Sequence, residues 1–137
     1  MRQRILITGA RSIDDLGAVY AHCDLLLGAA EDFPRVGVIL SGGQVGVDRI
    51  LESYARDNEI PFILIKPYHL VDAKAEHSTR HYFVRNKMMV DNSDWVIAFS
   101  DGVDAGTEDV INYTRKRGKA LTIIDRNQLN SVGGDNG

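Results

Sequence analysis

Cysteine is almost absent from this sequence, which has only Cys23 and no CxxC pair, so an internal disulfide is excluded. Long apolar runs are absent too, since none approaches the ~18 residues that a membrane span needs. The first apolar run, residues 5–7, is also far too short for the hydrophobic segment of a signal peptide. We therefore expect a cytoplasmic protein with no membrane partner.

An excess of basic residues is the next feature that the sequence lacks. The formal net charge is −3, because 19 Asp and Glu outnumber 16 Lys and Arg. Nonspecific binding to nucleic acid relies on a dense basic patch that displaces counterions, so from this balance we expect no nucleic acid partner. A small anion remains a candidate ligand, because backbone amides and one or two arginines are enough to bind it.

The length allows one domain. A chain of 137 residues is too short for two ordinary domains, and its 44% hydrophobic and 26% charged residues are typical of a globular protein. A chain of this length buries roughly two-thirds of the surface that it exposes when unfolded, so it needs no disulfide or metal for stability. We predict a single domain over residues 1–126 and a flexible, glycine-rich tail over residues 127–137.

Five short apolar segments alternate with segments of helical periodicity. The strand candidates are residues 4–8, 36–40, 61–65, 94–99 and 120–124, and the helical segments lie near 12–27, 47–55, 78–90 and 106–117. Runs that are apolar without alternation are typical of strands buried on both faces of a parallel sheet. We predict an α/β fold, a Rossmann-like three-layer sandwich with a mostly parallel sheet and right-handed crossovers. The connection over 66–79 is longer than usual and is therefore functional or mobile.

Many glycines directly follow predicted strands, namely Gly9, Gly42, Gly43, Gly46, Gly102 and Gly106. Because parallel strands end at one edge of a sheet, the three loops that carry these glycines are expected to meet there. Glycine lets a ligand approach the backbone closely, and each loop leads into a helix N-terminus that favours an anion. We predict a phosphate- or nucleotide-binding site at this edge. The alternative is that strand-to-helix turns simply favour glycine.

The loops lack the two best-known phosphate-binding signatures. Residues 7–12 contain no GxGxxG, and residues 41–48 lack the lysine of a P-loop, so neither ordinary dinucleotide nor triphosphate binding is supported. Arg11 stands at the first turn, where it either clamps a phosphate or pairs with a nearby acidic residue. Asp48 lies in the first turn of the second predicted helix, where it complements the helix dipole, accepts a hydrogen bond from a ribose hydroxyl, or does both.

Polar side chains also occur where an apolar helix face is expected. Asn86 falls on the apolar face of the third predicted helix, with Arg85 at the border of that face. A buried amide without hydrogen bonds costs roughly 1–3 kcal/mol, so Asn86 either fixes a neighbouring loop or touches a ligand. In the last loop, Thr107 and the Gly106 amide suit a phosphate oxygen, while Asp101 suits a ribose or another polyol.

Together these arguments give one predicted set of ligand-binding residues: Gly9, Arg11, Ser41, Gly42, Gly43, Gly46, Asp48, Arg85, Asn86, Asp101, Gly102, Gly106 and Thr107. The histidines are a weaker candidate site. His77 and His81 are four residues apart, with Glu76 and His69 nearby, but they match no tight metal-ligand signature. We therefore predict no metal and no cofactor.

The motifs, taken in order, are Ile7 to Arg11, then Ser41-Gly42-Gly43 with Gly46 and Asp48, then Arg85-Asn86 with Met89, then residues 94–99 followed by Asp101-Gly102 and Gly106-Thr107. This set resembles the SLOG superfamily, and more closely its small stand-alone bacterial and phage members related to YspA. The resemblance runs from Ile5 to Ile124. It implies a Rossmann-like sheet in the strand order 3-2-1-4-5 and a pocket for a nucleotide or a nucleotide-derived ligand.

The resemblance covers relatives with different activities. Some bind cyclic ADP-ribose-type or NAD-related molecules, and DprA-type relatives bind single-stranded DNA, which the acidic balance argues against here. The LOG phosphoribohydrolases carry a PGGxGTxxE motif, but Val110 stands where that motif has its glutamate, so their mechanism is not supported. The resemblance is compatible with a homo-oligomer, for which the sequence itself gives no interface.

We therefore expect a binding protein, a sensor or sequestering domain for a small-molecule nucleotide derivative, either of the ADP-ribose or NAD type or a mononucleotide. The second hypothesis is an enzyme that cleaves an N-glycosidic bond with Asp48, Asp101 or Glu108 as base or nucleophile. The third is a protein-interaction module whose pocket has lost its ligand.

Overall fold

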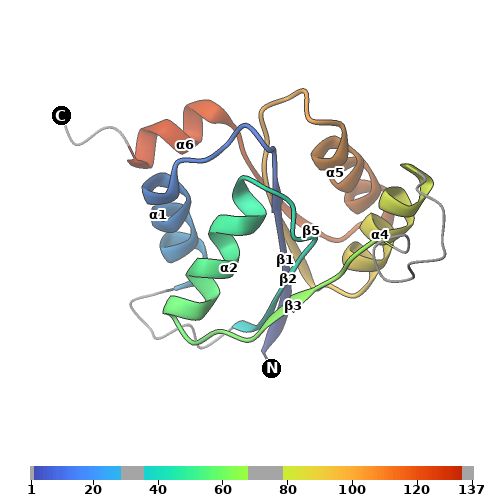
Figure 1. The fold of residues 1–137 in the computed structure, drawn as a ribbon, viewed down its shortest axis with the longest axis horizontal. Coiled ribbons are helices and arrows are strands. Elements are labelled where there is room, and N and C mark those ends of the chain that lie inside the picture. Colours follow the sequence, from blue (N-terminus) through green and yellow to red (C-terminus); the bar gives the residue numbers. More distant parts are fainter. Residues whose placement is uncertain (1, 29–35, 68–78, 134–137) are drawn as a thin grey trace.

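The structure is a computed structural model that describes residues 2–28, 36–67 and 79–133. The strands are β1 (Gln3–Gly9), β2 (Val36–Ser41), β3 (Phe62–Leu64), β4 (Trp95–Phe99) and β5 (Ala120–Ile124). The helices are α1 (Leu16–Leu27), α2 (Val47–Asp57), α4 (Thr79–Asp91), α5 (Ala105–Arg117) and α6 (Arg126–Gly133). All strand pairs are parallel and the order is β3-β2-β1-β4-β5, which confirms the predicted fold class. Helices α1, α2 and α6 cover one face of the sheet, and α4 and α5 cover the other (Figure 1).

The central strand shows why the apolar runs do not alternate. β1 pairs with β2 on one side and β4 on the other, and Ile5, Leu6 and Ile7 are each at most 1% exposed. Successive side chains of a strand point to opposite faces. Ile5 and Ile7 therefore join the core under α1, α2 and α6, whereas Leu6 joins the smaller core under α4 and α5. Both faces need apolar residues, so the run is apolar throughout.

The C-terminal residues differ from the prediction. We expected a flexible tail from residue 127, but residues 126–133 form α6, which packs against α1. Leu129 is buried in the core, and the Asp125 carboxylate accepts a hydrogen bond from the Gln128 amide (2.9 Å) at the start of the helix. One apolar residue and one capping carboxylate are thus enough to dock this helix, although the glycines near the end suggested fraying. Residues 134–137 lie outside the described residues.

Two further predictions concern the long connection over 66–79 and the absence of a membrane-spanning helix. Most of the long connection over 66–79 lies outside the described residues, together with His69, Glu76 and His77. Among the helices that are described, none is long and apolar enough to cross a bilayer.

Candidate functional site

The loops after β1, β2 and β4 meet at the carboxyl edge of the sheet. The Arg11 amide donates to the Asp104 carboxylate (3.3 Å), which joins the first loop to the last. Gly46 has a positive φ of 81°, and a Cβ there would lie 2.9 Å from the Ala10 and Arg11 carbonyl oxygens. Gly46 thus lets the first and second loops touch. This close backbone contact explains the glycine without a ligand.

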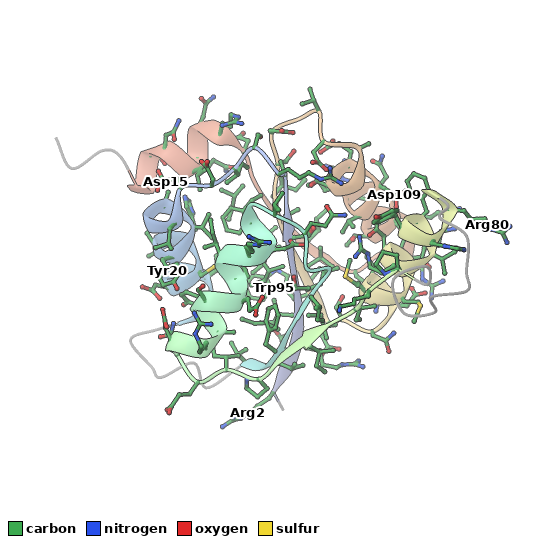
Figure 2. All side chains as sticks on the ribbon, viewed as in Figure 1. Arg2, Asp15, Tyr20, Arg80, Trp95 and Asp109 are labelled. Carbon is green, nitrogen blue, oxygen red and sulfur yellow. The ribbon has the colours of Figure 1, made fainter. Side chains whose placement is uncertain are left out.

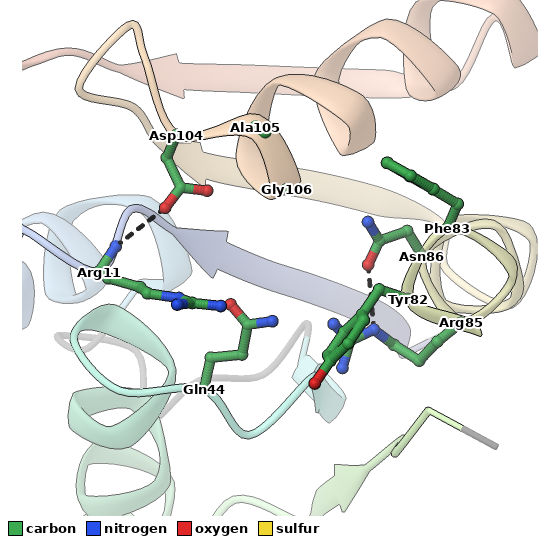
Figure 3. Close-up of a pocket in the computed structure, with 9 residues that line it drawn as sticks. All are labelled: Arg11, Gln44, Tyr82, Phe83, Arg85, Asn86, Asp104, Ala105 and Gly106. Atoms are coloured by element: carbon green, nitrogen blue, oxygen red, sulfur yellow. Dashed lines mark hydrogen bonds between the residues drawn. The ribbon is translucent and has the colours of Figure 1, made fainter. Parts of the chain in front are cut away.

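A pocket of about 500 Å³ opens between these loops and α4 (Figure 3). Its lining residues come from three parts of the chain: Arg11 and Gln44 from the first two loops, Tyr82, Phe83, Arg85 and Asn86 from α4, and Asp104, Ala105 and Gly106 from the start of α5. In Figure 3 the Arg11 and Gln44 side chains lie side by side, facing Tyr82 and Arg85. This volume is within the range of small-molecule sites.

Arg85 is the buried cation of this pocket. It is 4% exposed, and its Nη1 donates to the carbonyl oxygens of Gly42 (3.0 Å) and Ile65 (3.3 Å). The two ion pairs found among the described residues do not involve Arg85. Burial lowers the pKa of the Arg85 guanidinium, and the nearby charge of Asp48 opposes this effect. The site therefore contains a positive charge that is stabilised by carbonyl oxygens and has no carboxylate in contact with it.

The backbone of Gly42 packs against the guanidinium of Arg85. A Cβ on Gly42 would lie 2.6 Å from Nη1 and 2.9 Å from Cζ of Arg85, so the guanidinium rests directly on the glycine backbone. We predicted Gly42 as a residue that a ligand approaches, but the structure places an internal side chain there. The close approach that a glycine permits is thus made by the protein itself.

Gly42→Ala is expected to displace the Arg85 guanidinium and to destabilise the fold by about 1 kcal/mol, because the end of a long side chain can shift to relieve the clash. Urea unfolding measures this change. Gly17→Ala is the control at an exposed glycine, because a Cβ there would meet only the Asp15 carboxylate, at an ordinary contact distance of 3.7 Å. Full stability of Gly42→Ala would contradict the packing described here.

A second, much smaller cavity of about 10 Å³ lies beneath the pocket. Its walls are Thr8, Gly9, Gln44, Asp48, Arg85, Asn86, Met89, Gly106 and Thr107. Four of these residues, Gln44, Arg85, Asn86 and Gly106, also line the large pocket, so the two spaces adjoin. We call this space the inner cavity. Its volume is about that of one water-sized group.

Asp48 lines the inner cavity and carries the least satisfied polar atom of the site. Its side chain is buried, and Oδ2 accepts a hydrogen bond from the Gln44 amide (3.1 Å). Oδ1 is the one buried side-chain oxygen or nitrogen of the described residues that has no hydrogen-bond partner. Burial raises the pKa of Asp48 to about 6, and the charge of Asp104 adds to this rise. The backbone amides of Gln44 and Gly42 and the charge of Arg85 act in the opposite direction, although the Gly42 amide makes no hydrogen bond to Oδ1.

Asn86 links the two helices beside the pocket. Its Oδ1 accepts from Nε of Arg85 (3.0 Å), and its Nδ2 donates to Oδ2 of Asp109 (3.1 Å). Figure 2 shows Asp109 on α5 beside α4. Of the two roles considered for Asn86, the structure shows the fixing of a neighbouring element, which is α5, and also places Asn86 in the wall of both cavities.

The acidic residues of the last loop serve the protein's own backbone. Oδ1 of Asp101 accepts from the amides of Val103 (2.9 Å) and Asp104 (2.8 Å), and Oδ2 accepts from the Ser12 hydroxyl (2.8 Å). These bonds hold the pKa of Asp101 below its ordinary value. Asp104 caps α5 by accepting from the amide and hydroxyl of Thr107. Asp101 is therefore a structural residue of the loop in this structure.

The predicted site residues fall into two groups. Those that line the pocket or the inner cavity are Gly9, Arg11, Asp48, Arg85, Asn86, Gly106 and Thr107. Those that line neither are Ser41, Gly42, Gly43, Gly46, Asp101 and Gly102. Tyr82 and Phe83 were not among the predicted site residues, yet both line the pocket, and Phe83 is 43% exposed.

The part of the chain that is described holds no group of three His, Cys, Asp or Glu side chains arranged to bind a metal. His81 is described, but the other members of the histidine cluster are not. The prediction of no metal therefore stays a prediction.

The sequence model of the YspA, cpYpsA-related SLOG family matches residues 3–69, which include the first two loops of the site. The match covers just under half of the chain, and this part of the chain is similar to the SLOG superfamily. Comparison with the curated proteins gave no match. The resemblance that the ordered motifs suggested is thus confirmed.

Solved structures share the fold of this chain at low sequence identity. DNA processing protein A (DprA) from Streptococcus pneumoniae matches with a TM-score of 0.69 and 16% identity, over 89% of this chain and 50% of that one. DNA processing protein A from Helicobacter pylori gives 0.62 and 20%, over 88% and 64% of the two chains. The structural-genomics target TM1055 gives 0.61 and 17%, over 88% and 72%. This chain thus spans about half of the S. pneumoniae chain.

These neighbours contradict the prediction of no nucleic acid partner. The H. pylori structure is described as giving insight into the single-stranded DNA binding mode of that protein, which has this fold. Our prediction relied on the net charge of −3, which is an average over the whole chain. Binding depends on local charge, and Arg11 and Arg85 line one pocket. The acidic balance does not exclude nucleic acid.

Proposed function

We propose that this domain binds a phosphorylated nucleotide unit in the large pocket and acts as a sensor or sequestering protein for a nucleotide derivative. The observation that carries this proposal is the buried guanidinium of Arg85, which lines the pocket without a carboxylate in contact. Burying a cation is costly, and an anionic ligand would offset that cost. Arg11 lines the same pocket and is exposed, so it is free of the core and can follow the ligand.

The walls of the pocket suit the remaining parts of a nucleotide. Phe83 is a large aromatic side chain that stays 43% exposed, and Tyr82 lies beside it with its ring 5.6 Å from Cζ of Arg85. Exposed aromatic rings at a basic site favour stacking with a base. Gly106 lies at the N-terminus of α5, where the helix dipole favours an anion. The Asp104 carboxylate at the same end favours a single phosphate or a sugar over a dense polyphosphate.

The nucleotide unit has two potential sources, a free small molecule or one unit of a single strand. Mononucleotides, ADP-ribose and NAD⁺ form one arm of the test, and short single-stranded DNA and RNA oligomers form the other, all measured by calorimetry and thermal unfolding. Ligand at a hundredfold excess over its dissociation constant should stabilise the protein by about 2.7 kcal/mol. A panel in which neither arm binds would overturn the proposal.

Arg11→Gln is expected to weaken nucleotide binding about tenfold. A hydrogen bond from a charged donor contributes about 1.5–3 kcal/mol, and the bond from Arg11 to the ligand would lie at the low end because Arg11 is exposed to solvent. Arg49→Gln is the matched control, since Arg49 is exposed on α2 and lines a separate groove. Calorimetric titration of both variants with the best ligand of the panel decides the matter. Equal losses in the two variants would indicate general electrostatic attraction rather than contact in the pocket.

A second candidate function is hydrolysis of an N-glycosidic bond, and Asp48 is the observation that favours it. A buried carboxyl with an unpartnered oxygen and a pKa near 6 fits a general base. The LOG-type arrangement is not available, because Val110 is packed in the core, Glu108 accepts from Ser100, and Asp109 accepts from Asn86. Chromatography for release of a free base from AMP or NAD⁺ tests this candidate, with Asp48→Asn as the inactive control.

A further inference from the structure

The inner cavity presents a hydrogen-bond acceptor that the protein itself leaves unused. Asp48 Oδ1 is buried and unpartnered, and leaving such an atom without a hydrogen bond costs roughly 1–3 kcal/mol. Its sister atom Oδ2 is bonded to the Gln44 amide, so the carboxylate is held with Oδ1 as the open position. The site therefore lacks one donor for Oδ1. Asp48 is one of the residues that line the inner cavity.

The size and charge of the inner cavity restrict what that donor is. A volume of about 10 Å³ accepts one non-hydrogen atom with its hydrogens and excludes a phosphate or a ring. A cation is disfavoured by the Arg85 guanidinium in the wall, and an anion is disfavoured by the Asp48 carboxylate. The remaining lining groups are uncharged. A single neutral donor, either a hydroxyl group of a ligand or a water molecule, meets all of these conditions.

A hydroxyl of the molecule in the large pocket can enter the inner cavity, because the two spaces adjoin and share Gln44, Arg85, Asn86 and Gly106 as walls. In a nucleotide, the groups that carry hydroxyls are those of the sugar. We propose that the inner cavity is a subsite for a single ribose hydroxyl, which donates to Asp48 Oδ1, so that the domain selects ribonucleotides over one deoxy analogue. This inference rests on the proposed function and specifies its ligand as a ribose phosphate.

The test compares the ribose form of the best-binding mononucleotide with its 2′-deoxy and 3′-deoxy analogues, by calorimetry on the full chain. Only one hydroxyl fits the inner cavity, so one of the two analogues should lose about 10- to 100-fold in affinity while the other binds nearly as well as the ribose form. Asp48→Asn should bring the affinity ratio of the ribose form to the weaker analogue close to one. Asp91→Asn, an exposed carboxylate of α4 that bonds Tyr113, should leave the ratio unchanged.

A pH series gives a readout that a purely structural role of Asp48 would not move. The charged groups that face Asp48 are Arg85 from α4 and Asp104 from the start of α5. Protonation of Asp48 weakens its capacity as an acceptor, so the affinity ratio should decline between pH 7.5 and pH 5 in the wild type. In Asp48→Asn the ratio should stay flat over the same range.

The outcomes separate this inference from the function on which it rests. If no nucleotide or oligomer binds at all, the proposed function fails. If all three sugar forms bind equally, the nucleotide proposal stands and the hydroxyl subsite is overturned, with the inner cavity holding only a water. Loss with both analogues would also overturn it, because two hydroxyls would then be required. If the 2′-deoxy analogue is the one that loses affinity, RNA oligomers should also bind more tightly than DNA oligomers, and equal binding of the two would then overturn the subsite.

Discussion

Asp48→Asn should make the protein more stable at pH 8, by about 2–3 kcal/mol. In the folded protein, burial raises the pKa of Asp48 from 3.8 to about 6. The charged carboxylate is therefore less stable in the folded protein than in the unfolded chain. Asparagine has nearly the same shape and removes the buried charge. Its amide oxygen can still accept from the Gln44 amide, and its nitrogen then faces the inner cavity, which has room for one water.

The direction of the pH effect follows from the raised pKa. The folded protein binds a proton at Asp48 more tightly than the unfolded chain does, so stability contributed by protonation is complete below pH 3.8 and is lost as the pH rises through about 6. The difference of about two pH units corresponds to about 3 kcal/mol at most. The gain from Asp48→Asn should therefore be largest above pH 7 and should vanish near pH 4.

Urea unfolding of the wild type and Asp48→Asn at pH 4.5, 6 and 8 measures this pattern. Asp14→Asn is the control, since the same chemical change at an exposed carboxylate should shift stability by well under 1 kcal/mol. A variant that is less stable than the wild type at pH 8 would show that the Asp48 charge is compensated in the free protein. A gain that does not depend on pH would point to packing rather than ionisation.

A stabilising substitution at Asp48 has a functional meaning. A buried carboxylate with an open acceptor lowers the stability of the free domain, and sites that bind ligands commonly retain such groups at the expense of stability. The same substitution is expected to weaken the ribose contact. Stability and binding would then move in opposite directions, as expected if Asp48 serves the ligand.

The fold could be predicted from the sequence because its signals are local. The apolar runs of residues 4–8 and 94–99 mark buried parallel strands, and the structure has β1 and β4 there as neighbours. The edge at which the loops meet follows from the same parallel arrangement. The strand order came from the family resemblance, since local patterns do not fix it.

Several site residues could not be assigned from the sequence, because their roles depend on partners far along the chain. Gly42 was interpreted as an approach for a ligand, yet it is covered by Arg85, which is 43 residues away. Asp101 was interpreted as a contact for a sugar, yet its carboxylate holds two amides of its own loop and Ser12. The spacing of residues in a sequence does not show which carboxylate oxygens receive hydrogen bonds within the folded chain. Asp101 differs from Asp48 in this respect, because both Asp101 oxygens have donors and Asp48 Oδ1 has none.

Arg85→Met is expected to have the largest effect on both stability and ligand binding. Methionine fills much of the same volume but donates no hydrogen bonds, so the carbonyl oxygens of Gly42 and Ile65 and the amide oxygen of Asn86 each lose a partner. A buried group left unpaired costs about 1–3 kcal/mol, although water from the pocket can reach some of these atoms. We expect a loss of about 3–4 kcal/mol in the free energy of unfolding and a loss of more than 100-fold in nucleotide affinity.

Arg115→Met serves as the control, because Arg115 is exposed in the last turn of α5 and its loss should cost well under 1 kcal/mol. Since the Arg85 charge holds down the pKa of Asp48, Arg85→Met should also move the pH dependence of stability to higher pH. The double variant Asp48→Asn with Arg85→Met should then be more stable than the sum of the two single effects predicts, because the buried carboxylate no longer needs the cation. Strict additivity would show that the two buried charges do not act on one another, and the site would have to be described as two independent groups rather than one binding unit.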